Sequence, residues 1–165
     1  MRNELPSDLD LEAPMRAALA EAEAAGDAGE LPIGAVVVIE GEIVSRGRAA
    51  HRAHRSQLAH AELEALRAGG EAVWERHDEA VLFTTVEPCP MCLGAAVMAD
   101  VPHIVFASHD ALVHSSQTVE TNPYVSRHVR SYVGGVLEGE SRALIERLHP
   151  AFYSWIVRGL APDAG

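Results

Sequence analysis

The feature of this sequence that most constrains its fold is a pair of short segments that must meet in space. His60 and Glu62 lie in the first segment, and Cys89 and Cys92, the two cysteines of the chain, lie in the second. One imidazole and two thiolates are three zinc ligands, which leaves one open position on a tetrahedral ion. A fourth protein ligand would close the site and make it structural, so three ligands indicate a site for chemistry. The fold has to bring both segments to one metal ion.

The second segment, Pro88-Cys89-Pro90-Met91-Cys92, favours metal binding over redox chemistry. Cys89 and Cys92 lie near the predicted start of a helix, at a spacing that puts both side chains on one face. Unpaired backbone N–H groups and the helix dipole lower the pKa of thiols at such a position. A redox dithiol of the thioredoxin kind is the alternative, but it does not require a His-x-Glu segment upstream. We therefore assign His60, Cys89 and Cys92 to one Zn²⁺ per chain.

Glu62 is the candidate catalytic residue. A carboxylate that is close to zinc-bound water, but not on the zinc, can take a proton from the water and pass it to a leaving amine. In an ideal helix, positions 60 and 62 point about 200° apart, so we place His60 in the first turn of a helix with an irregular start. The alternative is a surface glutamate like Glu64. The catalytic role is favoured because H-x-E…P-C-x-x-C is the pattern of zinc-dependent nucleobase deaminases.

Length and composition predict one enzyme domain that spans residues 1–165. The chain has 22% charged residues and no apolar run of membrane-spanning length, so we expect no membrane partner. The first residues contain no apolar signal segment, and a C-x-x-C metal site suits a reducing compartment, which predicts a cytoplasmic location. The formal net charge of −11 argues against binding to the phosphates of a nucleic acid. We therefore expect a small heterocyclic substrate and no nucleic-acid partner.

Apolar patterning predicts strands that alternate with helices. We expect strands at 33–39, 42–47, 80–86, 103–107 and 131–137, and helices at 11–25, 58–68, 89–99 and 140–158. Gly69-Gly70 is expected to end the second helix, and Pro150 to interrupt the last one. Residues 49–57 are predicted to form a polar loop, and residues 110–130 have no clear pattern. This alternation is typical of an α/β fold with helices layered on a mixed sheet.

These segments resemble the cytidine deaminase-like superfamily, and within it the branch of nucleoside and guanine deaminases and tRNA adenosine deaminases. The resemblance runs from about Met15 to the C-terminus and includes residues 32–38, 58–67, 84–95 and 105–110. It implies a three-layer α-β-α sandwich with a five-stranded mixed sheet, which usually occurs as a homodimer. It also implies hydrolytic deamination, in which activated water attacks the amidine carbon of a flat heterocycle and Glu62 moves protons until ammonia leaves. Backbone N–H groups around Ala61 and Cys89 would line the pocket of the ring.

One departure from the family pattern concerns substrate recognition. An Asn that commonly grips the base or sugar in this family falls at Ala49 here, and a buried hydrogen bond of this kind can decide specificity. The segment His51–Arg55 is either a replacement recognition loop for a carboxylate or phosphate or a solvated connection, and we favour the connection. Near the C-terminus, Trp155 belongs to an aromatic cluster that either covers the pocket or packs in the core.

Three functions are compatible with the sequence. The favoured one is a zinc-dependent hydrolytic deaminase of a small aminated heterocycle, that is, a purine, pyrimidine, pterin or triazine base, or a nucleoside. The second is a tRNA adenosine deaminase, against which the acidic composition and the lack of a basic C-terminal segment count. The third is a zinc-bearing scaffold without catalysis, which would have no chemical need for Glu62.

Overall fold

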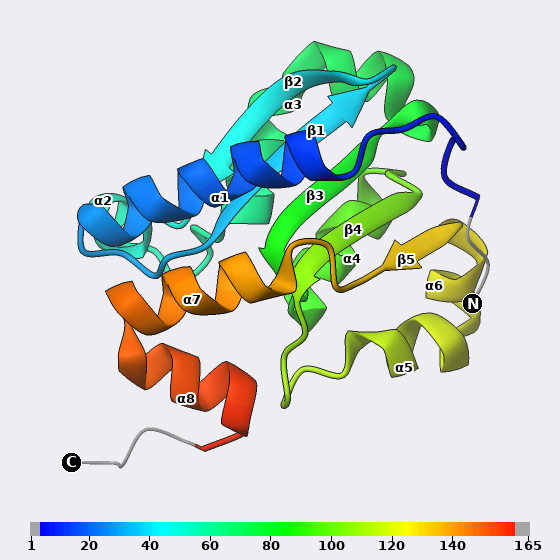
Figure 1. Cartoon of the computed structure of the whole chain (residues 1–165). Coiled ribbons are helices and arrows are strands. Elements are labelled where there is room, and N and C mark those ends of the chain that lie inside the picture. The colour runs from blue at the N-terminus through cyan, green and yellow to red at the C-terminus, as the bar shows by residue number, and fades with distance from the viewer. Residues whose placement is uncertain (1–3, 161–165) are drawn as a thin grey trace.

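The computed structural model describes residues 4–160 and contains a five-stranded sheet between two layers of helices (Figure 1). The strands are β1 (Gly34–Ile39), β2 (Glu42–Arg48), β3 (Val81–Val86), β4 (His103–Ser108) and β5 (Ser131–Val133). Their order in the sheet is β2-β1-β3-β4-β5. β1 runs antiparallel to β2 and β3, whereas β3, β4 and β5 are parallel to one another. The predicted three-layer α-β-α sandwich with a five-stranded mixed sheet is confirmed.

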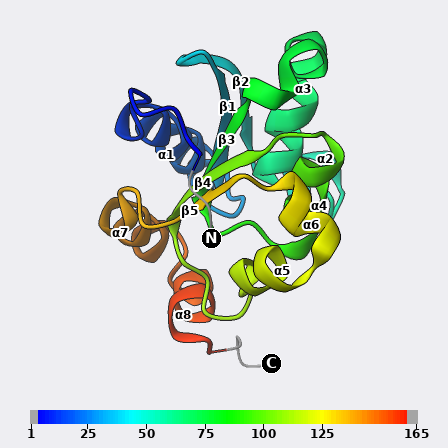
Figure 2. The same cartoon turned by 90° about the vertical axis from the view of Figure 1, so that its right-hand side faces the viewer.

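Two separate layers of helices cover the two faces of the sheet (Figure 2). One face of the sheet carries α1 (Glu12–Asp27) and α7 (Glu138–Leu148), and the other carries α3 (Ala61–Arg76), α4 (Pro90–Met98) and α6 (Pro123–His128). In β1, Val36 and Val38 pack under α1, while Ala35 and Val37 pack toward α3 and α4. This is the two-residue period of a pleated strand. Because β1, β3 and β4 are covered on both faces, each is buried along its whole length, as its apolar run predicted.

The helix that follows His60 begins and ends at later residues than predicted. α3 begins at Ala61 rather than at residue 58, and it continues to Arg76. Gly70 leaves the helical conformation, with φ 45° and ψ −123°. The glycine pair therefore breaks the helix, as its chemistry predicts, but the chain resumes the helix and continues into the short 3₁₀ turn His77–Glu79.

The other differences between the predicted and the observed elements lie in the segments that connect the main strands and helices. The last strand ends at residue 133 because Gly135 turns the chain at φ 91°. The predicted polar loop contains a four-residue helix, α2 (His51–His54). The stretch without a pattern contains α5 (Ser115–Thr121) and α6, and the Asn122 side chain accepts hydrogen bonds from two backbone N–H groups at the start of α6.

The C-terminal helical segment is divided at Pro150, as predicted, into α7 and α8 (Pro150–Arg158). Proline has no backbone N–H and its ring clashes with the preceding turn, so the two helices form separate elements. Among residues 4–160, no helix is both long enough and apolar enough to cross a membrane.

Candidate metal centre and active site

Two helices begin at the two metal-ligand segments. His60 comes directly before α3 and Cys89 directly before α4, and both have extended backbones, with φ −78°, ψ 149° and φ −64°, ψ 167°. Pro90 occupies the first position of α4, where its missing N–H costs no hydrogen bond. The prediction that His60 lies in the first helical turn is therefore wrong. Its extended backbone removes the angular separation of an ideal helix, so His60 and Glu62 line the same cavity.

Close packing against β2 fixes the position of α3. A Cβ atom at Gly47 would collide with the backbone oxygen of Ala61 and the backbone nitrogen of Ala65. Ser45, on the same strand, donates a hydrogen bond from Oγ to the Ala65 carbonyl oxygen at 2.7 Å. Because glycine alone permits this approach, β2 holds the first turn of the helix that carries Glu62.

The three predicted ligands come together with the spacing of a tetrahedral site. The Sγ atoms of Cys89 and Cys92 are 3.5 Å apart, and Nδ1 of His60 lies 3.7 Å from the first and 3.4 Å from the second. With the usual Zn–S and Zn–N bond lengths, tetrahedral zinc needs about 3.8 Å between two sulfurs and about 3.6 Å between sulfur and nitrogen. The residues therefore fit a zinc ion with three protein ligands. No second group of this kind occurs within the part of the chain that the structure describes.

The pKa values of the three metal ligands are shifted in different directions. The pKa of Cys89 is lowered to about 4 because the Cys92 thiol donates a hydrogen bond to its sulfur and the His60 ring adds another. The same bond, together with burial, raises the pKa of Cys92, and the bond with Cys89 raises the pKa of His60. Cys89 is therefore a thiolate at neutral pH, the form that binds zinc. The Gln57 backbone, beside the ring, also raises the pKa of His60.

Glu62 lies beside the metal ligands inside the protein. The residue is 4% exposed, so a surface glutamate is excluded, and its carboxyl group lies beside the thiol of Cys92. Burial raises the pKa of Glu62. A buried carboxyl group with a raised pKa can both take and give a proton near neutral pH, which suits the role predicted from the spacing.

Glu87 is a buried residue of the site that the sequence analysis did not identify. Its carboxylate accepts hydrogen bonds from the backbone N–H groups of Asp110 and Ser116, at 3.2 and 3.3 Å, and from the Tyr132 hydroxyl at 3.2 Å. These partners come from the loop after β4, from α5 and from β5. Glu87 thus ties the turn before Cys89 to three later segments. The one signal in the sequence is its position beside the Pro-Cys motif.

A cavity of about 300 Å³ opens beside the metal ligands. His60, Glu62 and Cys89 form part of its wall, and the side chains of α8 close another part of it. This volume is at the lower end of the range for small-molecule sites. It suits one flat heterocycle placed next to the zinc ligands and Glu62.

Of the three predicted substrate contacts, Trp155 lines the cavity, whereas Ala49 and Ala61 do not. Trp155 lines the cavity, is 42% exposed and lies edge-on to Phe152, so it is not a core residue. Ala49 and Ala61 are buried, and neither is among the described residues that line the cavity. His51, from the segment that we interpreted as a solvated connection, does line it.

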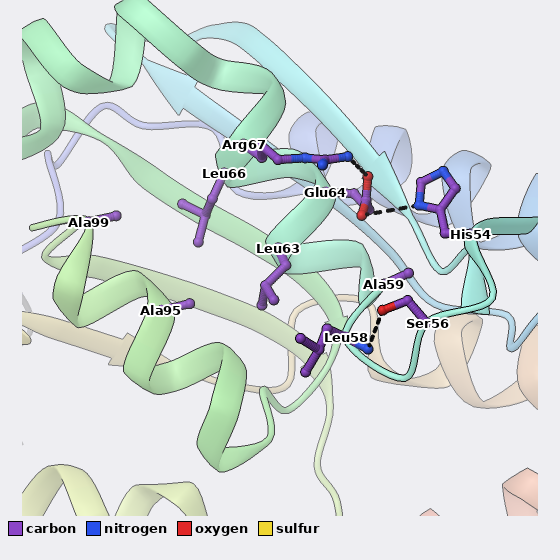
Figure 3. A pocket seen from close by; sticks show the side chains of 10 residues that line it. All are labelled: His54, Ser56, Leu58, Ala59, Leu63, Glu64, Leu66, Arg67, Ala95 and Ala99. Carbon is purple, nitrogen blue, oxygen red and sulfur yellow. Dashed lines mark hydrogen bonds and ion pairs between the residues drawn. The ribbon is translucent and has the colours of Figure 1, made fainter.

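A second hollow lies between α3 and α4 and does not include the metal ligands (Figure 3). Its apolar wall consists of Leu58, Leu63, Leu66, Ala95 and Ala99. At its rim, the His54 ring points toward Glu64, with an N–O distance of 3.5 Å. Leu58 is 62% exposed, so this groove presents apolar side chains to solvent, away from the metal ligands.

A family model, a relative and two solved structures that are similar to this chain are all described as deaminases. Residues 9–108 match the family described as "Cytidine and deoxycytidylate deaminase zinc-binding region". Over 137 residues, the chain is 39% identical to a tRNA-specific adenosine deaminase of Bacillus subtilis, which covers 79% of this chain and 83% of the relative. A solved structure from studies of A-to-I editing by tRNA:A34 deaminases is 32% identical, with a TM-score of 0.72, over 80% of this chain and 98% of that one. A guanine deaminase structure from Nitrosomonas europaea is 25% identical, with a TM-score of 0.67, over 89% and 88%.

Proposed function

Because this chain belongs to the cytidine and deoxycytidylate deaminase family of zinc-dependent hydrolytic deaminases, we propose that it deaminates adenosine in transfer RNA. The similarity to the Bacillus subtilis tRNA-specific adenosine deaminase carries this proposal, since it covers most of both chains. The small cavity supports it, because a deaminase that acts on a polynucleotide takes one flipped-out base into its pocket. We further propose that residues 1–165 act as one deaminase domain in the cytoplasm.

The prediction of no nucleic-acid partner is wrong, because the relative and the solved structure cited above are described as tRNA deaminases. That prediction relied on the net charge of −11, which sums over the whole chain. A nucleic acid meets only one face of a protein, so a local group of basic residues is sufficient. Next to the cavity-lining His51, the chain has Arg52 in α2 and Arg55 directly after it. Two basic side chains therefore belong to the short segment that also supplies a residue of the cavity wall.

The reaction assigns a role to each residue of the centre. His60, Cys89 and Cys92 would hold zinc, which when bound supplies an electrophilic centre that makes water more acidic. Glu62 accepts a proton as the water oxygen forms its bond to C6 of adenine. Glu62 then donates a proton to the exocyclic nitrogen, the C–N bond breaks and ammonia leaves. Adenosine and water are consumed, and inosine and ammonia are formed.

The proposal is tested by incubating the zinc-loaded protein with tRNA and measuring inosine by mass spectrometry after nuclease digestion. We expect inosine at the wobble position with the wild-type chain and none with Glu62→Ala, which serves as the matched inactive control. Ammonia release from free bases without any inosine in tRNA would exclude tRNA as the substrate.

Deamination of a free purine base is the second candidate. The similarity to the guanine deaminase of Nitrosomonas europaea extends over 89% of this chain, further than the similarity to the tRNA:A34 deaminase structure. The α8 side chains at the cavity, among them Trp155, also narrow the space beside the zinc ligands. Ammonia release from guanine and other aminated bases distinguishes this candidate from the tRNA reaction.

The homodimer expected from the family resemblance is also a proposal. The groove between α3 and α4 is the surface that we assign to the second copy, because its wall is apolar and Leu58 within it is 62% exposed. Contiguous exposed apolar side chains commonly mark an interaction surface. Light scattering should give the mass of two chains for the wild type and of one chain for Leu58→Glu.

A further inference from the structure

His51 is a cavity residue to which the proposed reaction gives no role. It is the first residue of α2, it lines the cavity, and its ring lies edge-on to that of His60, with centroids 5.0 Å apart and an interplanar angle of 68°. Its Nδ1 atom is buried and has no hydrogen-bond partner within residues 4–160. An unpaired buried polar atom costs folding free energy and calls for an explanation. A ring that is kept in the cavity wall at this cost can have its use in its other nitrogen, Nε2.

The buried Nδ1 atom indicates which nitrogen of the ring carries the hydrogen. A buried N–H group without an acceptor is rarer in proteins than an acceptor without a donor. We therefore place the hydrogen of the neutral ring on Nε2. Since Nδ1 lies within the wall, Nε2–H is the group of this ring that can meet a molecule in the cavity.

The short helix that carries His51 is held in place by Glu30. The Glu30 carboxylate is 9% exposed and accepts hydrogen bonds from the backbone N–H groups of Arg52, at 3.0 Å, and Ala53, at 2.9 Å. Glu30 itself is not among the residues that line the cavity. A side chain on an anchored helix keeps a fixed direction. A residue needs such a fixed direction to distinguish one ligand from another.

We infer that His51 is a specificity-determining residue, whose Nε2–H donates a hydrogen bond to an acceptor atom of the bound base or of its sugar. The inference rests on the proposed use of the cavity as the deaminase site, but it holds for tRNA and for a free base. Suitable acceptors are an unprotonated ring nitrogen, a carbonyl oxygen or a hydroxyl oxygen. A ligand without an acceptor at this place leaves the N–H group unpaired and binds less tightly.

The test measures binding, so that it does not depend on turnover. Every variant is made in the full-length, zinc-loaded Glu62→Gln protein, and the probe is an anticodon stem-loop RNA with adenosine at the wobble position. His51→Phe keeps a ring beside His60 but has no nitrogen, and we expect it to raise the Kd about tenfold. His51→Gln places its amide near the position of Nε2, so it should restore more affinity than His51→Asn, whose amide lies near that of Nδ1. Zinc content should be unchanged throughout, and the Tm unchanged or higher.

His77→Phe is the matched control. His77 also has a buried Nδ1 atom without a hydrogen-bond partner among residues 4–160, but it lies in the 3₁₀ turn His77–Glu79 and does not line the cavity, so its replacement should change the Kd by less than about twofold. Equal affinity of His51→Phe and the Glu62→Gln parent overturns the inference. A loss of affinity that follows a loss of zinc also overturns it, because His51 would then act through His60.

Repeating the series with guanine as the probe separates this inference from the proposed function. If guanine binds and the stem-loop RNA does not, tRNA is excluded as the substrate, while the order of affinities among the His51 variants still tests the inference. If the parent protein binds neither probe, the cavity is not the substrate site and both proposals fail.

Discussion

The Sγ atom of Cys92 lies 3.4 Å from Nδ1 of His60, although the two residues are 32 positions apart in the chain. The contact exists because α3 and α4 pack on the same face of the sheet and begin at neighbouring points. His60 precedes one helix, and Cys92 lies in the first turn of the other. The spacing of the zinc ligands therefore depends on how both helices pack on the strands, as well as on the two motifs.

Glu62→Gln should remove most of the turnover and leave the metal in place. Glutamine has nearly the same shape but cannot carry the proton, so kcat is expected to fall about 10²–10⁴-fold. Burial disfavours the charged carboxylate of Glu62, and the Tm should therefore be equal to or above that of the wild type. Steady-state kinetics, metal analysis and thermal unfolding check these outcomes. Turnover close to the wild-type rate would remove Glu62 from the mechanism.

Gly47→Ala should weaken both the fold and the zinc site. The new Cβ atom meets the backbone of α3 at Ala61 and Ala65, so the helix must shift, at a cost of about 1–3 kcal/mol in the free energy of unfolding. Because His60 and Glu62 are attached to the same turn, zinc affinity should fall as well. Denaturant unfolding and a competition assay with a zinc chelator measure the two effects.

Gly139→Ala is the matched control for that experiment. A Cβ atom at Gly139 has no neighbour within 4 Å, and the residue lies in α7. Alanine is a better helix former than glycine, so this change should be neutral or stabilise the protein by about 0.5–1 kcal/mol. If both variants lose the same stability, the contact between β2 and α3 does not determine the effect.

The sequence was sufficient to predict the metal ligands, the buried strands and the layers, because each depends on local spacing or on a regular apolar period. Local spacing and apolar period could not predict two other residues of the cavity wall, Glu87 and His51. Two of the three donors to Glu87, Asp110 and Ser116, lie in residues 110–130, and this stretch shows no apolar period that predicts its two short helices. His51 lies in a polar segment, and its burial depends on the distant Glu30, which holds α2 through backbone N–H groups. Side chains of this kind are positioned by tertiary contacts alone.

Glu87→Gln should destabilise the fold through the three hydrogen bonds that its carboxylate accepts. An amide group faces at least one of these donors with its own NH₂ group, which leaves a buried donor unpaired and costs about 1–3 kcal/mol. Glu71→Gln is the control, because Glu71 is exposed, and it should change the free energy of unfolding by less than about 0.5 kcal/mol. Denaturant unfolding of both variants provides the comparison. Equal stabilities would mean that the Glu87 network does not hold the turn before Cys89.

Acid should loosen α2 through Glu30. Burial opposes the ionisation of Glu30, but the hydrogen bonds from the backbone N–H groups of Arg52 and Ala53 outweigh it, so its pKa is lowered from the model-compound value of 4.5. A carboxyl group with a lower pKa in the folded chain contributes stability above its unfolded pKa and loses this contribution as the pH falls through the folded value. Hydrogen-exchange protection of the Arg52 and Ala53 amides should therefore fall as the pH is lowered below the ordinary carboxyl range and through the folded pKa of Glu30.

The Glu30→Gln variant identifies the group responsible for that change. Its amide oxygen can still accept from these N–H groups, but it carries no charge and does not titrate, so protection at Arg52 and Ala53 should be lower than in the wild type at neutral pH and should not change further on acidification. Since α2 carries His51, the same variant should bind the stem-loop RNA more weakly at neutral pH while its zinc content stays unchanged. If Glu30→Gln keeps the protection and the acid response of the wild type, another group anchors α2, and the fixed direction of the His51 ring needs a different cause.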